Sequence, residues 1–392
     1  MTTVLLCPDS FKGSLSAPEA AEAMARGLRR VWPGAEIHLM PMADGGEGTL
    51  DAVLAATEGQ RLQLAVTGAD GRPVTAAYGV LDRGEGPVAV LEAAQVVGLT
   101  LPLPAEVAQR TTLGLGELVR HCLDQGIRDF MIGLGGSSTN DGGSGVLAAL
   151  GARLLDQAGQ PVHPSPSGLA RLVRVDLSGL DRRLKACRIT LMADVVNPLC
   201  GPLGATAVFG PQKGVAPGEA AEIDGRLRHL AALCDAWYGG PLSTAPGTGA
   251  AGGLGYGFAL LGASIRSGAE VVCELMGMDA ALRETDWVVT GEGRSDAQTL
   301  QGKVPMVVAA RAARMGVPVT LVSGSVDRGS LPDFARHFQG CFSIAFGPDT
   351  LERTMAEGAG LLADSLEQLA RLLAFRGSGS FPRRITHREV YP

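Results

Sequence analysis

The sequence contains few lysines and no cluster of positive charge. Only four of its 34 basic residues are lysines, and no run of lysine and arginine is longer than two residues. The formal net charge of the 392-residue chain is −6. Because proteins that bind nucleic acid present a basic face, we expect no nucleic-acid partner. An anionic ligand would have to be held by a few locally placed cations.

Paired cysteines and long hydrophobic spans are also missing. The seven cysteines are scattered, their number is odd, and no C-x-x-C motif occurs. This pattern is typical of free thiols in a reducing cytosol, and the sequence shows no signal peptide, so we expect a cytoplasmic protein. The longest uncharged segment, 236–265, contains Pro241, Pro246 and many glycines. We interpret it as a binding loop followed by a buried helix, and we expect no membrane partner.

Familiar nucleotide-binding signatures are absent as well. The chain has no G-x-x-x-x-G-K-[ST] loop, no H-R-D or D-F-G motif, and no G-x-G-x-x-G after its first predicted strand. These absences disfavour P-loop enzymes, protein kinases and Rossmann dehydrogenases. An enzyme with this sequence would have to bind a nucleotide through other loops.

Glycine, in contrast, is abundant. The chain has 55 glycines, bunched between short apolar runs and helical segments, and this alternation predicts an α/β protein of two domains. Apolar residues at helical spacing predict helices over 16–31, 220–237 and 351–373. The predicted strands are 4–7, 37–40, 88–91, 130–134, 189–193, 287–290, 319–322 and 342–346.

A hairpin signal marks the start of a different domain. Asp70-Gly71 lies between two strand-like segments and predicts a tight turn, which is foreign to a purely doubly wound sheet. We therefore expect a second domain to begin near residue 65. The residues from 378 on lack periodicity and are interpreted as a loose tail.

Two polar loops follow the first two predicted strands. The loop PDSFKGS (8–14) places Lys12 between a strand and a capped helix, where phosphate groups are readily bound. The loop ADGGEGT (43–49) places Asp44 and Glu47 among glycines, where carboxylates could hold Mg²⁺ or accept a hydroxyl proton. The alternatives are an exposed turn lysine in the first loop and a helix cap in the second.

The loop GLGGSSTNDGG (133–143) is the hardest to explain by packing. It follows a predicted strand and contains one leucine and no other bulky side chain. Its backbone N–H groups could form an anion-binding nest, its three hydroxyls add donors, and Asp141 adds a base or metal ligand. The alternative is a tight glycine turn in which Asn140 and Asp141 cap helices.

Two further loops and a glycine-rich segment complete the set. The long loop 194–214 contains Lys213, and the loop that starts at 290 is followed by Lys303. Three of the four lysines thus adjoin a glycine within a polar loop, and a compact ammonium group suits phosphate oxygens. Each loop could instead be structural. The uncharged segment 247–257 either lets a nucleotide approach the backbone or allows a close helix contact.

Taken together, these loops resemble the bacterial glycerate kinase family of the glycerate 2-kinase type. The matching stretches are PDSFKGSLSA (8–17), ADGGEGT (43–49), GLGGSSTNDGG (133–143), ADVVNPLCGPLGATAVFGPQKG (193–214), GAAGGLGYG (249–257) and TGEGRSDAQTLQGKVP (290–305). The likeness extends to about residue 375. It implies a two-domain α/β fold, in which a Rossmann-like parallel-sheet domain (1–64 and 286–376) carries an inserted mixed α/β domain (65–285), with 377–392 as a tail.

The resemblance also implies an activity. The family uses ATP and Mg²⁺ to phosphorylate D-glycerate, usually at the 2-hydroxyl, giving 2-phosphoglycerate and ADP in glyoxylate and serine metabolism. A kinase of another small hydroxy acid or sugar remains an alternative, as does a non-catalytic sugar-acid-binding sensor. The sequence leaves open whether the protein is a monomer or a homodimer.

Chemical roles follow from residue type. Lys12 and Lys303 would neutralise phosphate or carboxylate charge, and Asp44 or Asp141 would orient or deprotonate the substrate hydroxyl. The predicted catalytic residues are Lys12, Asp44, Asp141, Asp194 and Asp296, and the predicted metal ligands are Asp194, Asn197 and Asp296. The predicted substrate- or phosphate-binding residues are Ser10, Gly45, Gly46, Glu47, Gly136, Ser137, Ser138, Thr139, Asn140, Lys213, Gly291, Glu292, Gly293 and Lys303.

Overall fold

The computed structural model describes residues 2–82, 84, 86–102 and 104–374 and consists of two compact units. Among the described residues, the first unit is formed by 2–44, 51–58 and 269–374, and the second by 45–50 and the described part of 59–268. Both units are α/β, and the first draws on both ends of the chain, which confirms the predicted fold class. The predicted tail, 377–392, lies outside the described residues.

A five-stranded parallel sheet forms the centre of the first unit. The strands lie in the order β15-β13-β11-β1-β2. The three central strands are almost entirely apolar and buried, as strands covered on both faces must be. The bounds are β1 (Thr3–Pro8), β2 (Glu36–Leu39), β11 (Trp287–Gly291), β13 (Val319–Ser323) and β15 (Gly340–Ser343).

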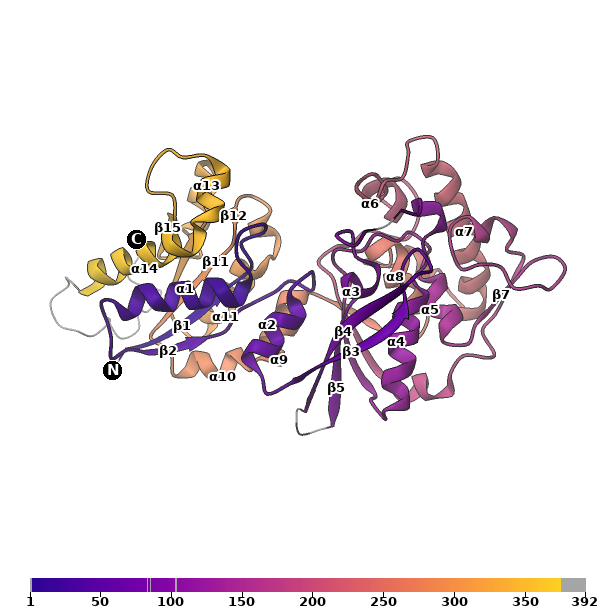
Figure 1. Ribbon diagram of the computed structural model, residues 1–392, viewed down its shortest axis with the longest axis horizontal. Helices are drawn as coiled ribbons and strands as arrows, with labels where there is room; N and C mark the ends of the chain where they lie inside the picture. Colours follow the sequence, from indigo (N-terminus) through magenta and orange to yellow (C-terminus); the bar gives the residue numbers. More distant parts are fainter. Residues whose placement is uncertain (1, 83, 85, 103, 375–392) are drawn as a thin grey trace. The chain divides into compact units, whose positions relative to one another are not determined.

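Two helices from opposite ends of the chain lie side by side against this sheet (Figure 1). Helix α1 (Ala17–Arg29) begins with the predicted capping box of Ser16 and Glu19, and its apolar face packs against α14 (Gly358–Ala374). The contact is close because a Cβ on Gly27 would lie 2.0 Å from the carbonyl oxygen of Ala363.

Two predicted elements at the end of the chain need correction. The predicted helix 351–373 is two helices, α13 (Leu351–Ala356) and α14, and Ser14 donates to the carbonyl of Met355 close to the break. The predicted strand 342–346 is displaced, because β15 ends at Ser343 and the side chain of Phe346 is exposed. The spacing of apolar residues did not show the break in the helix, and apolar content misplaced the strand.

The connections of the sheet reverse direction between β1 and β11. From β1 the chain passes through α1 to β2 on one side, whereas from β11 it passes through α11 (Val304–Arg314) to β13 on the other. In open α/β sheets, ligands bind outside the carboxyl ends of the strands at such a switch point. The fold therefore places the loops after β1 and β11 where a ligand is expected.

The second unit is built on a six-stranded mixed sheet in the order β10-β9-β6-β5-β4-β3. The predicted hairpin is present as the antiparallel pair β3 and β4, and β5, β6, β9 and β10 run parallel to one another. The bounds are β3 (Gln60–Thr67), β4 (Pro73–Asp82), β5 (Pro87–Glu92), β6 (Asp129–Gly133), β9 (Arg188–Met192) and β10 (Ser264–Arg266).

The remaining helices and short strands lie outside the two main sheets. No helix within the described ranges is long and apolar enough to span a membrane. The remaining bounds are α2 (Thr49–Ala56), α3 (Ala93–Val97), α4 (Leu113–Asp124), α5 (Ser144–Ala149), α6 (Ala205–Lys213), α7 (Ala220–Tyr238), α8 (Ala250–Ala259), α9 (Gly268–Leu275), α10 (Met278–Arg283), α12 (Leu331–Phe334), β7 (Arg153–Leu155), β8 (Arg174–Asp176), β12 (Arg294–Ser295) and β14 (Ser325–Val326).

The compact units divide the chain at different residues from the predicted domain boundaries of 65 and 285. All of β3 lies in the second unit because it pairs along its length with β4. Nearly all of α9 and all of α10 lie in the first unit, where the buried Arg311 of α11 forms ion pairs with Glu270 and Asp279. Such ion pairs between distant segments have no signature in a single sequence.

Candidate functional site

The first unit brings two of the predicted cations to its switch-point loops. Lys12 is exposed on the loop after β1, and Lys303 immediately precedes α11. The two loops pack closely, because the amide of Asp9 donates to the carbonyl of Gly291 (2.8 Å) and a Cβ on Gly293 would lie 3.3 Å from the amide nitrogen of Lys12. Positive charge and a helix N-terminus favour an anionic ligand here.

Carboxylates accompany these cations. Asp9, which the sequence analysis did not select, is only 9% exposed at the end of β1, and its Oδ1 accepts from the amide of Ser10 (2.6 Å). Burial and, to a lesser extent, the neighbouring carboxylates of Asp44 and Glu292 raise the pKa of Asp9 to about 7, against the lowering effects of Ser10 and Lys12. Asp9, Asp44 and Glu292 therefore form a carboxylate cluster in the first unit.

Glu292 is fixed by hydroxyl groups. Its Oε1 accepts from Ser295 (3.0 Å) and Thr299 (2.6 Å), and burial raises its pKa against the opposing effects of Thr299 and Lys303. The predicted Asp296, in the same loop, caps the amide of Gln298 and pairs with Arg294. The predicted Gly291 has a packing role, because a Cβ there would lie 1.8 Å from the carbonyl oxygen of Val322 on the adjacent strand.

In the second unit, a buried lysine holds the 133–143 loop. The Nζ of Lys213, at the end of α6, donates to Ser137 Oγ (3.0 Å) and to the carbonyl of Thr139 (2.7 Å). Burial, together with a smaller effect of Arg110, lowers the pKa of Lys213 to about 7 against the opposing effect of Asp141. Its ammonium group supports the loop from within the protein.

Arg110 is a second support that the sequence analysis missed. Its Nη1 donates to the carbonyls of Ser138 and Lys213, both at 3.1 Å. It therefore connects the 133–143 loop to the end of α6. Nothing around Arg110 resembles a motif, and only the fold shows the residue beside this loop.

The buried Asp141 anchors two helices. Its Oδ2 accepts from the amide and the hydroxyl of Thr112 (both 2.8 Å) before α4, and from the amide of Gly145 in the first turn of α5. Its Oδ1 accepts from the amide of Gly143 (3.0 Å), and burial raises its pKa. This geometry matches the alternative interpretation of Asp141 as a cap, and it leaves little capacity to take a substrate proton.

Unpaired polar atoms concentrate in the same loop. Thr139 Oγ1, Asn140 Oδ1 and Ser144 Oγ are buried, and none has a hydrogen-bond partner among the described residues. The side-chain Nδ2 of Asn140 donates to Thr206 Oγ1 (2.9 Å) near the start of α6. Buried polar atoms normally have partners, so this loop is the strongest candidate for polar ligand contacts in the second unit. Ser138 instead donates to the carbonyl of Val97 (2.8 Å).

The ADGGEGT loop belongs to both units. Asp44 lies in the first unit, whereas residues 45–50 pack on the second. There the amide of Gly135 donates to the carbonyl of Gly45 (3.1 Å), and a Cβ on Gly135 would lie 2.5 Å from the Cα of Gly46. Gly45, Gly46 and Gly135 therefore allow two backbones to touch. Gly136, the next residue of the 133–143 loop, is exposed. The Oε1 of Glu47 accepts from Thr100 (2.8 Å).

The predicted metal ligands are distributed between the units. Asp194 and Asn197 lie in the second unit. The Oδ1 of Asp194 accepts from the backbone amide of Gly268 (3.1 Å), and the side-chain Nδ2 of Asn197 donates to the carbonyl of Leu203 (2.8 Å). Asp296 lies in the first. Across the described part of the chain, no group of three His, Cys, Asp or Glu side chains could hold a metal ion.

The glycine-rich segment 249–257 is a packing element. Ala251, Gly252 and Gly253 have successive positive φ angles of 53°, 68° and 93°. A Cβ on Gly252 would lie 2.0 Å from the carbonyl oxygen of Thr139, and one on Gly257 would lie 2.8 Å from the Cα of Gly143. Of the two interpretations given above, these contacts favour close backbone packing. The segment supports the 133–143 loop.

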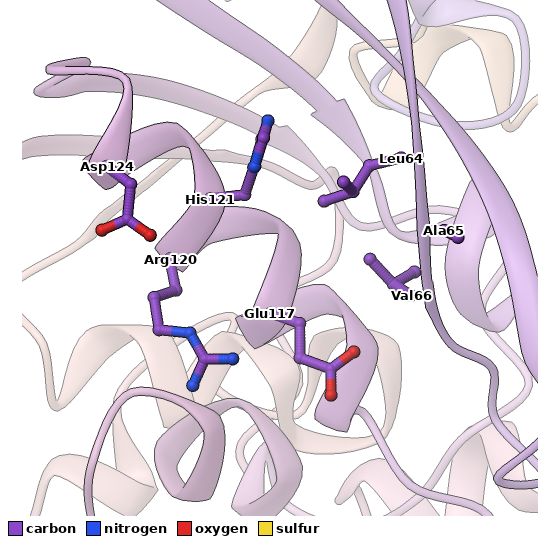
Figure 2. Close-up of a pocket in the computed structure, with 7 residues that line it drawn as sticks. All are labelled: Leu64, Ala65, Val66, Glu117, Arg120, His121 and Asp124. Carbon is purple, nitrogen blue, oxygen red and sulfur yellow. The ribbon is translucent and has the colours of Figure 1, made fainter.

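A separate cavity of about 330 Å³ lies between β3 and α4 (Figure 2). Figure 2 shows the side chains of Glu117 and His121 on α4, and both have other partners: Glu117 accepts from Thr67, and His121 contacts the hydroxyl of Tyr78. None of the predicted site residues lines this cavity. We therefore place the candidate site at the loops.

Glycine-rich loops with lysines and carboxylates after the strands of α/β sheets are typical of proteins that bind phosphorylated small molecules. The chain belongs to the glycerate kinase family, whose model matches residues 4–374. It is 42% identical over 375 residues to the glycerate kinase of Bacillus subtilis, covering 95% of this chain and 96% of that protein. It is 42% identical over 327 residues to the glycerate 2-kinase of Escherichia coli, covering 82% and 85%.

A solved structure matches as well. The crystal structure described as glycerate kinase 2 from Salmonella typhimurium superposes with a TM-score of 0.84 at 40% identity, covering 95% of this chain and 98% of that one. The family resemblance that the six sequence motifs indicated is thereby confirmed.

Proposed function

We propose that the protein transfers a phosphoryl group from ATP to glycerate. The observation that carries this proposal is membership of the glycerate kinase family over residues 4–374, in a chain whose loops carry the lysines and carboxylates described above. A kinase of this family implies ATP as co-substrate. The direct test is ADP release by the purified protein with ATP and D-glycerate. L-glycerate, tartronate and glycerol serve as comparison substrates, and a preference for tartronate or glycerol over glycerate would contradict the proposal.

Phosphoryl transfer depends mainly on positioning and charge neutralisation. In the first unit, Lys12 and Lys303 supply cations, with the N-terminus of α11 beside them. In the second unit, Ser137 and Thr139 offer polar groups on a loop that Lys213 holds in place. We propose that both sets of loops are needed for turnover. Alanine substitutions at Lys303 and Ser137, made separately, should each lower turnover, and full activity in either variant would contradict this point.

We propose that Mg²⁺ enters with ATP. The described chain offers no cage of three ligands, and a nucleotide-bound Mg²⁺ needs only one or two protein carboxylates in addition to phosphate oxygens. Asp194, Asn197 and Asp296 remain the proposed ligands, and the ion would neutralise charge on the phosphates. Activity should be lost in excess chelator and return with added Mg²⁺. Full turnover with metal-free ATP would contradict this requirement.

We propose the 2-hydroxyl of D-glycerate as the acceptor. The proposal is supported by the relative from Escherichia coli, which is named glycerate 2-kinase. Coupling the product to enolase without a mutase distinguishes the isomers, because enolase acts on 2-phosphoglycerate and not on 3-phosphoglycerate. A signal only after a mutase is added would assign the 3-hydroxyl instead.

We further propose that the protein works in the cytoplasm. All seven cysteines are free thiols, which a reducing compartment preserves. Fractionation of the native host would test this location.

A further inference from the structure

Asp9 is held in one orientation by backbone contacts on both sides. Its amide donates to the carbonyl of Gly291 (2.8 Å), and the carbonyl of the preceding Pro8 accepts from the amide of Met42 (2.8 Å). The amide of Ser10 donates to Asp9 Oδ1 (2.6 Å). Its Oδ2, in contrast, has no hydrogen-bond partner among the residues that the structure describes. One carboxylate oxygen is therefore fixed, and the other is free to take a proton.

The position of Asp9 is that of a ligand-binding residue. It directly follows β1, at the switch point where ligands of open α/β sheets bind. The charged groups that face it are Asp44 after β2, Glu292 after β11 and Lys12 on its own loop. Since a carboxylate that is more than 90% buried next to two others is unfavourable for folding, a requirement of function explains its retention.

We propose that Asp9 is the catalytic residue that accepts the hydroxyl proton of glycerate during phosphoryl transfer. The inference rests on the proposed function. As the hydroxyl oxygen forms its bond to the γ-phosphorus of ATP, the proton passes to Asp9 Oδ2. The bond between that phosphorus and the bridging oxygen breaks, and its electron pair leaves with ADP. The carboxyl group returns the proton to water after the products depart.

The geometry favours Asp9 over the two acids that the sequence suggested for this step. Both carboxylate oxygens of Asp141 already accept hydrogen bonds from backbone amides and a hydroxyl near the starts of α4 and α5. Asp44 is half-buried, whereas Asp9 is almost fully enclosed and has one oriented oxygen. The raised pKa of Asp9 agrees with this role, because a general base works best when its pKa lies near the working pH.

The test compares Asp9→Asn with Asp9→Glu and with the control Asp286→Asn. Asp286 directly precedes β11 and accepts from the amide of Thr3 at the start of β1, so the control removes a carboxylate from the opposite end of the same central strands. The wild-type protein is assayed first with ATP, Mg²⁺ and D-glycerate. If it has no activity, the proposed function fails, and Asp9 is not the cause. Circular dichroism and thermal unfolding establish that each variant is folded.

We expect Asp9→Asn to lower kcat by about 100-fold or more, with the KM values for ATP and glycerate changed by less than about threefold. Asp9→Glu should restore part of the rate, and Asp286→Asn should match the wild type. The wild-type rate should fall as the pH drops below about 7, and this acid limb should be absent in Asp9→Asn. The proposal is overturned if folded Asp9→Asn keeps a kcat within threefold of wild type, if its acid limb persists, or if excess Mg²⁺ restores its rate.

Discussion

At the scale of single residues, the carboxyl group of Asp9 should destabilise the fold at alkaline pH. Its pKa is raised in the native protein, so the native state binds this proton more tightly than the unfolded chain does. The native state is therefore favoured at low pH; that advantage declines as the pH rises above the ordinary aspartate pKa of about 4 and is gone above about 7. Asp9→Asn should raise the free energy of unfolding by about 1–4 kcal/mol at pH 8 and change it little at pH 4.

Urea unfolding of the wild type and Asp9→Asn at both pH values measures this difference. Equal changes at pH 4 and pH 8 would show that the effect does not come from ionisation. A gain of stability together with a loss of turnover would separate the chemical role of this residue from any packing role.

Lys12 should affect turnover and not stability. Its side chain is exposed on a glycine-containing loop, so it packs little, whereas its charge lies where a phosphate is expected. Lys12→Ala should lower turnover by about 100-fold, which corresponds to roughly 3 kcal/mol of transition-state stabilisation. The matched control is Lys185→Ala, since Lys185 is the one lysine outside the candidate loops and is also exposed. Wild-type kinetics in a folded Lys12→Ala protein would reduce Lys12 to an ordinary surface residue.

Residue type predicted the candidate loops better than it predicted the role of each side chain. Lys12 lies on a loop after a strand, as expected, whereas much of the predicted loop around Lys213 is helix α6 and Lys213 is buried within the protein. Asp141, predicted as a base or metal ligand, accepts hydrogen bonds at the starts of two helices, as its alternative interpretation expected. Arg110 and Asp9 were missed, because their importance depends on burial and on neighbours that lie far away in the sequence.

At the scale of elements, two glycines should respond in opposite ways to the same substitution. Gly252 has a φ of +68°, and a Cβ there would lie 2.0 Å from the carbonyl oxygen of Thr139, so Gly252→Ala should destabilise the protein by more than about 2 kcal/mol. Gly225 lies within α7, and a Cβ there would meet nothing within 4 Å. Gly225→Ala should stabilise the protein by up to about 1 kcal/mol.

Thermal unfolding of both variants provides the measurement. Because Gly252 supports the 133–143 loop, Gly252→Ala should also lower turnover, whereas Gly225→Ala should leave it unchanged. A Gly252→Ala protein with wild-type stability and activity would contradict the packing role of the 249–257 segment.

Buried strands were the elements most easily predicted from the sequence. Continuous apolar runs such as those of β1 and β11 leave little choice of structure, and the Asp70-Gly71 turn identified its hairpin. The boundaries near the end of the chain were misplaced where apolar residues such as Phe346 are exposed. The glycine motifs were interpreted as ligand-binding loops. Many of these glycines instead allow two backbones to touch, and such contacts can be recognised only once the fold is known.

At the scale of the whole molecule, the resemblance of six ordered motifs predicted both units, but the boundaries depended on contacts between distant segments.

The arrangement of the two units along the chain predicts an order of folding during synthesis. Nascent chains arrested with residues up to about 285 outside the ribosome should contain a protease-resistant core from the second unit. Their first 44 residues should be cleaved readily, because β11 has not yet been made. Early protection of these residues would contradict the prediction.

The pairing of β1 with β11 also determines how long the N-terminal strand remains without its main partner strand during synthesis. Partners in the two strands are 283 residues apart, so at 5–20 residues per second β1 emerges on the order of 15–60 s before β11. During that time an almost wholly apolar strand has only β2 as a neighbour from its own sheet. Chaperones that recognise short apolar segments should therefore bind this protein at its first strand, and slow translation should increase its tendency to aggregate.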